Sequence, residues 1–169
     1  MTMSGGSDVR DESVEVFREA AIEWAALGNG QVVVDAALSV LLADLDGATE
    51  EVSRLAGVLA ASVDDEVEEL LPDAARSLGV EVYEAQSHEA GIACARLFAR
   101  RCLDGVMSTD QLTYEASRLW KLCRESSELF QLMGMNLGGD ETAHFSSADW
   151  DAVDRGVREI AVQLLEGTS

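Results

Sequence analysis

The chain has 169 residues, of which 47% are hydrophobic and 26% charged, and its formal net charge is −20. This is the composition of a globular protein long enough to bury a core, so it excludes a wholly disordered chain and a fibrous repeat. The excess of carboxylates disfavours direct binding to nucleic acids or anionic membranes, because phosphate contacts need clustered lysine and arginine.

The N-terminal segment 1–12 is polar and has no apolar run, so we predict a disordered tail and not a secretory signal. No apolar stretch approaches the roughly 18 residues that a membrane span needs, and Asp35 interrupts the longest one. We therefore expect a cytoplasmic protein without membrane association. Its length predicts a single helical domain over residues 13–167.

Apolar residues at helical spacing predict a first helix, with Val14, Phe17, Ala21 and Trp24 on one face. We expect this helix to end at Gly28–Asn29–Gly30, where both glycines suit left-handed turn positions. The next segment, Gln31–Leu45, is apolar on nearly all sides. It predicts a central helix that is buried on most of its faces.

Two further helices are indicated by capping residues. Thr49 can cap a helix that runs through Ala61, and Ser62 with Asp65 can cap the next one. Pro72 is expected to end or restart that helix, because proline lacks the backbone donor that the helix interior needs.

The second half of the chain predicts three helices. The first is capped near Ser87 and ends at Asp104–Gly105, and the second spans Ser108–Arg124 with a capping box of Ser108 and Gln111. The third is capped by Ser146 or Ser147, stops at Gly167 and buries an apolar face formed by Trp150, Val153, Val157, Ile160 and Leu164. Six or seven helices with short connections predict an all-α fold, arranged as a compact bundle.

No residue pattern predicts catalysis, a metal site or a cofactor. The three cysteines, Cys94, Cys102 and Cys123, lie in predicted helices and are interpreted as buried free thiols. A di-metal helical bundle needs two Glu-x-x-His elements, and the chain has one, at Glu141 and His144. Asp35 is expected at the rim of its helix or beside an arginine, and a functional buried acid is the alternative.

Charge is distributed unevenly along the chain. Residues 1–90 hold 20 acidic and 4 basic residues, whereas residues 91–169 hold 12 and 8. The densest acidic run contains Asp64, Asp65, Glu66, Glu68 and Glu69. Such a run is either a solvated helix face or a docking surface for a basic protein.

The basic residues of the second half could form one strip that pairs with the acidic half or meets an anionic ligand. These residues are Arg96, Arg100, Arg101, Arg118, Lys121 and Arg124.

A loose sequence pattern runs from Ala95 to Leu165. It consists of Leu97–Phe98, Leu103–Asp104–Gly105, Leu119–Trp120 and Trp150 at the head of the last amphipathic helix. In these residues the chain resembles small acidic helical bacterial proteins of unknown function, some of which occur in toxin-immunity settings. The resemblance implies no catalytic residues.

These observations favour binding over catalysis. The hypothesis is a non-enzymatic acidic module that binds a basic protein through the run Asp64–Glu69, as an immunity-type inhibitor of a basic toxin or nuclease would. Two alternatives stay open at this point. One is a bundle enzyme or small-ligand-binding protein with a pocket between helices, and the other is a structural subunit that associates with itself as a homo-oligomer.

Overall fold

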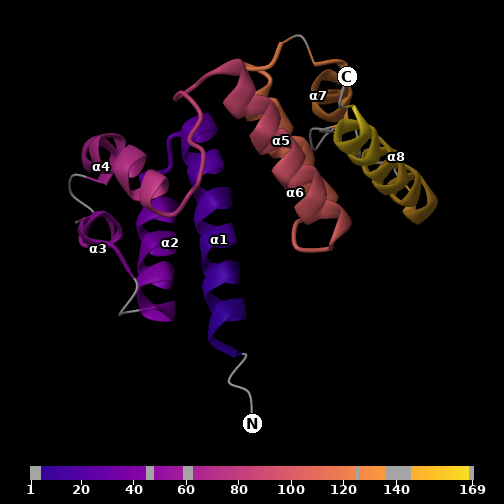
Figure 1. Cartoon of the computed structure of the whole chain (residues 1–169). Coiled ribbons are helices and arrows are strands. Elements are labelled where there is room, and N and C mark those ends of the chain that lie inside the picture. The colour runs from indigo at the N-terminus through magenta and orange to yellow at the C-terminus, as the bar shows by residue number, and fades with distance from the viewer. Residues whose placement is uncertain (1–4, 45–47, 59–62, 125, 136–145, 168–169) are drawn as a thin grey trace. The chain divides into compact units, whose positions relative to one another are not determined.

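A computed structural model describes residues 5–44, 48–58, 63–124, 126–135 and 146–167. Within these ranges the chain forms eight helices and no strand (Figure 1). In order they are α1 (Gly5–Leu27), α2 (Gly30–Ala43), α3 (Glu50–Ala56), α4 (Val63–Ser77), α5 (His88–Leu103), α6 (Thr109–Leu119), α7 (Ser127–Gly134) and α8 (Ser147–Glu166). The all-α class is confirmed, while the predicted count of six or seven helices was too low.

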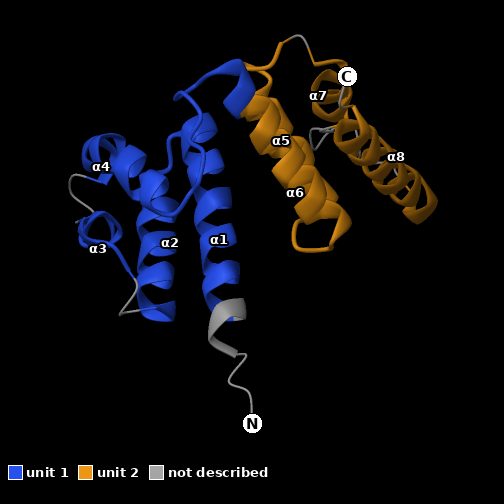
Figure 2. Ribbon diagram, in the orientation of Figure 1, with its two compact units in different colours: residues 1–90 blue, residues 91–169 orange. Residues whose placement is uncertain are grey.

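The chain divides into two compact units, Met1–Ala90 and Gly91–Ser169, and the boundary falls in the first turn of α5 (Figure 2). The single domain expected over residues 13–167 stays a prediction. The boundary coincides with the change in charge. Unit 1 has a net charge of −16 and unit 2 a net charge of −4.

Unit 1 contains α1 to α4. Helices α1 and α2 pack side by side, and α2 also packs against α3 and α4 (Figure 1). Its core includes Phe17, Val33, Leu55 and Leu71, each with no exposed surface. Burial of these side chains stabilises the unit, since each fully buried apolar side chain contributes about 1.5–3 kcal/mol.

Several predicted boundaries in unit 1 need correction. Helix α1 begins at Gly5, so residues 5–12, which we assigned to the tail, are helical, and Arg10 in this stretch pairs with Asp44. Helix α3 ends at Ala56, not at Ala61. Pro72 lies within α4 and does not end it, because it is on the exposed side, where solvent can satisfy the carbonyl that loses its helical donor.

The turn between α1 and α2 also differs from the prediction. Gly28 has a φ of +76°, as expected of a left-handed turn residue, but Gly30 is already the first residue of α2. Helix α2 is less buried than predicted, since Leu38 and Leu42 are 43% and 67% exposed. It therefore buries one broad face against its neighbours and leaves the opposite face in solvent.

Unit 2 contains α6, α7, α8 and all but the first residues of α5. Helix α6 packs against α7 and α8, and α7 packs against α8. The capping box of Ser108 and Gln111 is formed as predicted, and Ser146 forms a second one with Asp149. Helix α6 ends at Leu119 and not at Arg124, and α7, whose N-cap is Ser126, was not predicted.

Among the described residues, no helix combines the length and the hydropathy needed to cross a membrane.

Candidate functional site

The predicted acidic run forms the first half of α4 in unit 1. Asp64, Asp65, Glu68 and Glu69 are exposed, and Glu66 is partly buried. Residues three and four apart share a side of a helix, so the four exposed carboxylates form one surface, which we call the acidic α4 face. The opposite side of the helix buries Val67, Leu71, Ala74 and Ala75.

One member of this face, Asp64, also has a role inside unit 1. Its Oδ1 accepts a hydrogen bond from the backbone N–H of Gly30 at 3.3 Å, and the N-cap residue Asn29 makes no side-chain capping bond. Asp64 therefore supplies the acceptor that the N-terminus of α2 lacks locally. The contact also explains Gly30, because a Cβ there would lie 2.8 Å from the same oxygen.

The arginines of unit 1 are mostly paired with carboxylates outside the acidic α4 face. Arg10 bonds to Asp44 at 3.1 Å, and Arg18 pairs with Glu15. Arg76, on the last turn of α4, bonds to Asp73 at 2.5 Å. These pairs place three of the four basic residues of the unit beside other acids. None of these three pairs involves Asp65, Glu68 or Glu69.

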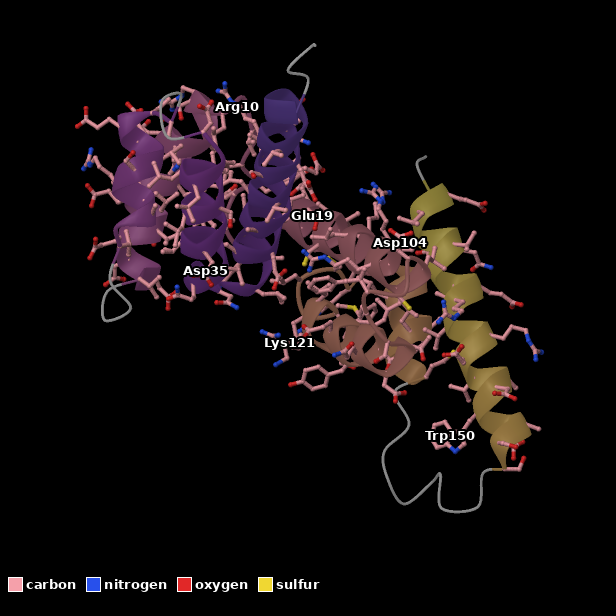
Figure 3. The ribbon with its side chains drawn as sticks, turned by 90° about the horizontal axis from the view of Figure 1, so that it is seen from below. Arg10, Glu19, Asp35, Asp104, Lys121 and Trp150 are labelled. Atoms are coloured by element: carbon pink, nitrogen blue, oxygen red, sulfur yellow. The ribbon has the colours of Figure 1, made fainter. Side chains whose placement is uncertain are left out.

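Asp35 is not a buried acid. It is exposed on α2 (Figure 3), and its Oδ1 accepts a hydrogen bond from Nε2 of Gln31 at 2.8 Å. Asp35 therefore lies on the solvent-exposed side of α2, as expected of an acid at the edge of the buried face, and it is not a functional buried acid.

Three of the six basic residues of the predicted strip have local partners, and the strip itself stays a prediction. Arg96 donates to the backbone carbonyls of Leu164 and Gly167, at 3.3 and 2.7 Å. Arg118 pairs with Glu115 at 2.9 Å, while the guanidinium of Arg101 lies 5.8 Å from the centre of the Phe98 ring. The bonds of Arg96 lie at the end of α8, and the pair of Arg118 and Glu115 lies on the surface of α6.

All three cysteines are free and buried, as predicted. Burial raises the pKa of Cys102, and it raises the pKa of Cys123 from an ordinary value near 9.0 to about 11. Such thiols are poor nucleophiles, since the thiolate is the reactive form. Both thiols are part of the core of unit 2.

The raised pKa of Cys123 predicts a loss of stability in alkaline solution. Between the pH values near 9 and 11 the folded chain keeps this proton and the unfolded chain releases it, so stability falls as pH rises through that window. We expect the urea midpoint of the wild type to fall more steeply between about pH 9 and pH 11 than that of Cys123→Ala. Parallel pH profiles for the two proteins would contradict this assignment.

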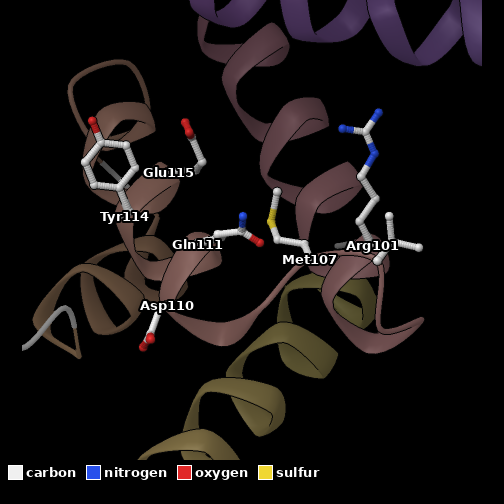
Figure 4. A pocket seen from close by; sticks show the side chains of 7 residues that line it. Arg101, Met107, Asp110, Gln111, Tyr114 and Glu115 are labelled. Atoms are coloured by element: carbon white, nitrogen blue, oxygen red, sulfur yellow. The ribbon is translucent and has the colours of Figure 1, made fainter.

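A groove on unit 2, which sequence reasoning missed, lies where α5 turns into α6. It has a volume of about 430 Å³ and is lined by Arg101, Val106, Met107, Asp110, Tyr114 and Glu115, among others. In Figure 4, Tyr114 and Glu115 lie on one side and Arg101 on the other, with Met107 between them. Val106 and Tyr114 are 75% and 58% exposed, so the groove presents apolar surface to solvent.

The two histidines considered as metal ligands differ in how far the structure describes them. His88 is exposed at the start of α5, and the Glu141–His144 pair lies outside the described residues. Among the residues that are described, no group of three or more His, Cys, Asp or Glu side chains could hold a metal ion.

No protein-family model, curated protein or solved structure matches the chain.

Proposed function

We propose that the chain is a non-enzymatic module that binds a basic protein through the acidic α4 face of unit 1. The observation that supports this proposal most directly is that Asp65, Glu68 and Glu69 are exposed together on a unit with a net charge of −16. Three of the four arginines in that unit are already paired with other carboxylates. An immunity-type inhibitor of a basic toxin or nuclease is the role that this charge distribution suits best.

The physical basis of the proposal is electrostatic steering. A concentrated negative field on one helix face accelerates encounter with a positively charged partner and disfavours acidic proteins. A toxin or nuclease that binds phosphate carries clustered lysine and arginine, which are complementary to this face. Neutralising the face should therefore slow association more than it speeds dissociation.

The first test identifies the partner. The purified chain is immobilised, lysate proteins are retained at low and at moderate salt, and they are identified by mass spectrometry. We expect one or more basic proteins that are retained best at low salt. Retention of no protein at either salt concentration would remove the basis of the proposal.

The second test asks whether the acidic α4 face is the contact. Glu68→Gln with Glu69→Gln removes two charges from exposed positions, and Glu81→Gln with Glu84→Gln removes two from exposed positions elsewhere in unit 1. We expect the first pair to lower the association rate about threefold to tenfold and the control pair to change it by less than about twofold. Equal effects would show that net charge, and not this face, guides the partner.

Asp64 is left unchanged in these variants because it caps α2. A binding loss in an Asp64 variant could reflect a displaced helix, whereas Glu68 and Glu69 can be neutralised without removing that capping bond.

A further inference from the structure

Helix α5 ends in a tightly hydrogen-bonded turn that fixes the position of Val106. The N–H of Val106 donates to the carbonyl of Arg101 at 2.8 Å, and the N–H of Gly105 donates to that of Cys102 at 3.2 Å. Gly105 has a φ of +77°. These are the two bonds and the left-handed glycine of a Schellman motif.

Helix α4 ends in the same motif, which provides an internal comparison. The N–H of Val80 donates to the carbonyl of Ala75 at 2.9 Å, and Gly79 has a φ of +68°. In such motifs the residue after the glycine commonly packs back onto the helix. Val80 does so and is 6% exposed, whereas Val106, at the equivalent position, is 75% exposed.

The exposed valine belongs to a rigid wall of the groove. The capping box of Ser108 and Gln111 orders the first turn of α6, with the N–H of Ser108 donating to Oε1 of Gln111 at 2.9 Å. Tyr114 follows on the next turn of this helix and is 58% exposed. The hydrogen-bonded turn and the capped helix fix the backbone that carries this aliphatic and this aromatic side chain, which lowers the entropic cost of binding.

The charged residues of the groove favour a cation beside this apolar wall. Asp110 and Tyr114 are four residues apart on α6 and so are surface neighbours, whereas the other carboxylate of the groove, Glu115, is paired with Arg118. The one basic residue among those lining the groove, Arg101, is positioned over the Phe98 ring. A lysine or arginine of a partner could meet the carboxylate of Asp110 and the face of Tyr114 together.

We propose that the groove of Val106, Met107 and Tyr114 is a docking site for a protein segment that presents an aliphatic side chain next to a lysine or arginine. The aliphatic side chain fills the wall around Val106, and the cation lies at the rim formed by Asp110 and Tyr114. This site is in unit 2 and does not depend on the acidic α4 face of unit 1, so either proposal can fail without the other.

The test uses the full-length, isotope-labelled chain and two short peptides in an NMR titration. The probes are acetyl-Leu-Lys-Leu-amide and its glutamate counterpart, acetyl-Leu-Glu-Leu-amide. We expect the lysine peptide to shift the amide signals of residues 101–115 with a Kd on the order of 1 mM, and the glutamate peptide to bind about fivefold more weakly or worse. Shifts confined to other parts of the chain would overturn the site.

Variants of the groove residues distinguish binding in the groove from a general attraction of the lysine peptide to an acidic protein. Val106→Ser and Tyr114→Ala should each weaken the lysine peptide about threefold or more, and Asp110→Asn should reduce the preference for lysine over glutamate. Val162→Ser is the matched control, because Val162 is 40% exposed on α8 and does not line the groove.

Three results would overturn the proposal. Val106→Ser could bind the lysine peptide as well as the wild type does, or the two peptides could bind equally. Native mass spectrometry of the purified chain could also detect a small molecule that Val106→Ser loses, which would make the groove a small-ligand pocket instead of a protein-docking site.

Discussion

Replacing Gly91 with alanine is expected to destabilise the chain by about 2 kcal/mol, although alanine is the better helix former. A Cβ at position 91 would lie 2.2 Å from Sγ of Cys123 and 3.3 Å from Cβ of Leu122. Cys123 is completely buried, so its sulfur has no open space to move into. Overpacking of this kind lowers the free energy of unfolding by up to about 3 kcal/mol. The higher helix propensity of alanine offsets about 1 kcal/mol of this loss.

A double-mutant cycle isolates this contact. Cys123→Ala removes the sulfur, so Gly91→Ala should cost much less in that background than in the wild type, with a coupling of about 2 kcal/mol in urea unfolding. Gly134→Ala is the control, because a Cβ there meets no atom within 4 Å. An equal cost of Gly91→Ala with and without the sulfur would show that α5 does not approach Cys123 this closely.

The elements that could be predicted from the sequence are those with local signals. Thr49, Ser108 and Ser146 each cap the helix that follows, and the side chain of each accepts the expected backbone hydrogen bond. Gly105 ends α5 because its φ is +77°, a conformation that glycine adopts at little cost. Such signals depend on residues a few positions apart, so they need no knowledge of tertiary structure.

The boundaries that were missed depend on packing instead. Cys123 continues the apolar pattern of Leu112, Ala116 and Leu119 and predicted a helix through Arg124, but α6 ends at Leu119. The chain there turns so that Cys123 packs against Gly91. Ser126, three residues before the buried Leu129, was the available signal for α7, since its side chain accepts from the N–H of Leu129.

The candidate sites also include one feature that local sequence signals predict and others that depend on tertiary packing. The acidic run is visible as five carboxylates between Asp64 and Glu69, and helical spacing alone predicts a shared face. That Asp64 caps α2 is not visible, because Gly30 is 34 residues away along the chain. The groove was missed because the turn sequence does not determine whether the valine after the glycine is buried. The two turns have the same backbone hydrogen bonds, yet Val80 is buried and Val106 is exposed.

Replacing Arg96 with methionine is expected to destabilise unit 2 by about 1–2 kcal/mol by releasing the end of α8. The guanidinium of Arg96 donates to the carbonyl of Leu164 at 3.3 Å and to that of Gly167 at 2.7 Å. These carbonyls belong to the last turn and the C-cap of α8, which lack helical donors and carry partial negative charge. Methionine keeps much of the apolar stem and removes both charged hydrogen bonds.

Arg100→Met is the matched control, since Arg100 is exposed on the same helix and its loss should change stability by less than about 0.5 kcal/mol. Arg96→Lys should recover part of the loss, because an ammonium group keeps the charge but cannot span both carbonyls as the planar guanidinium does. Hydrogen exchange should locate the effect, with faster exchange in the last turn of α8 in Arg96→Met. Unchanged exchange there would mean that Arg96 does not hold this helix end, and the stability loss would then need another cause.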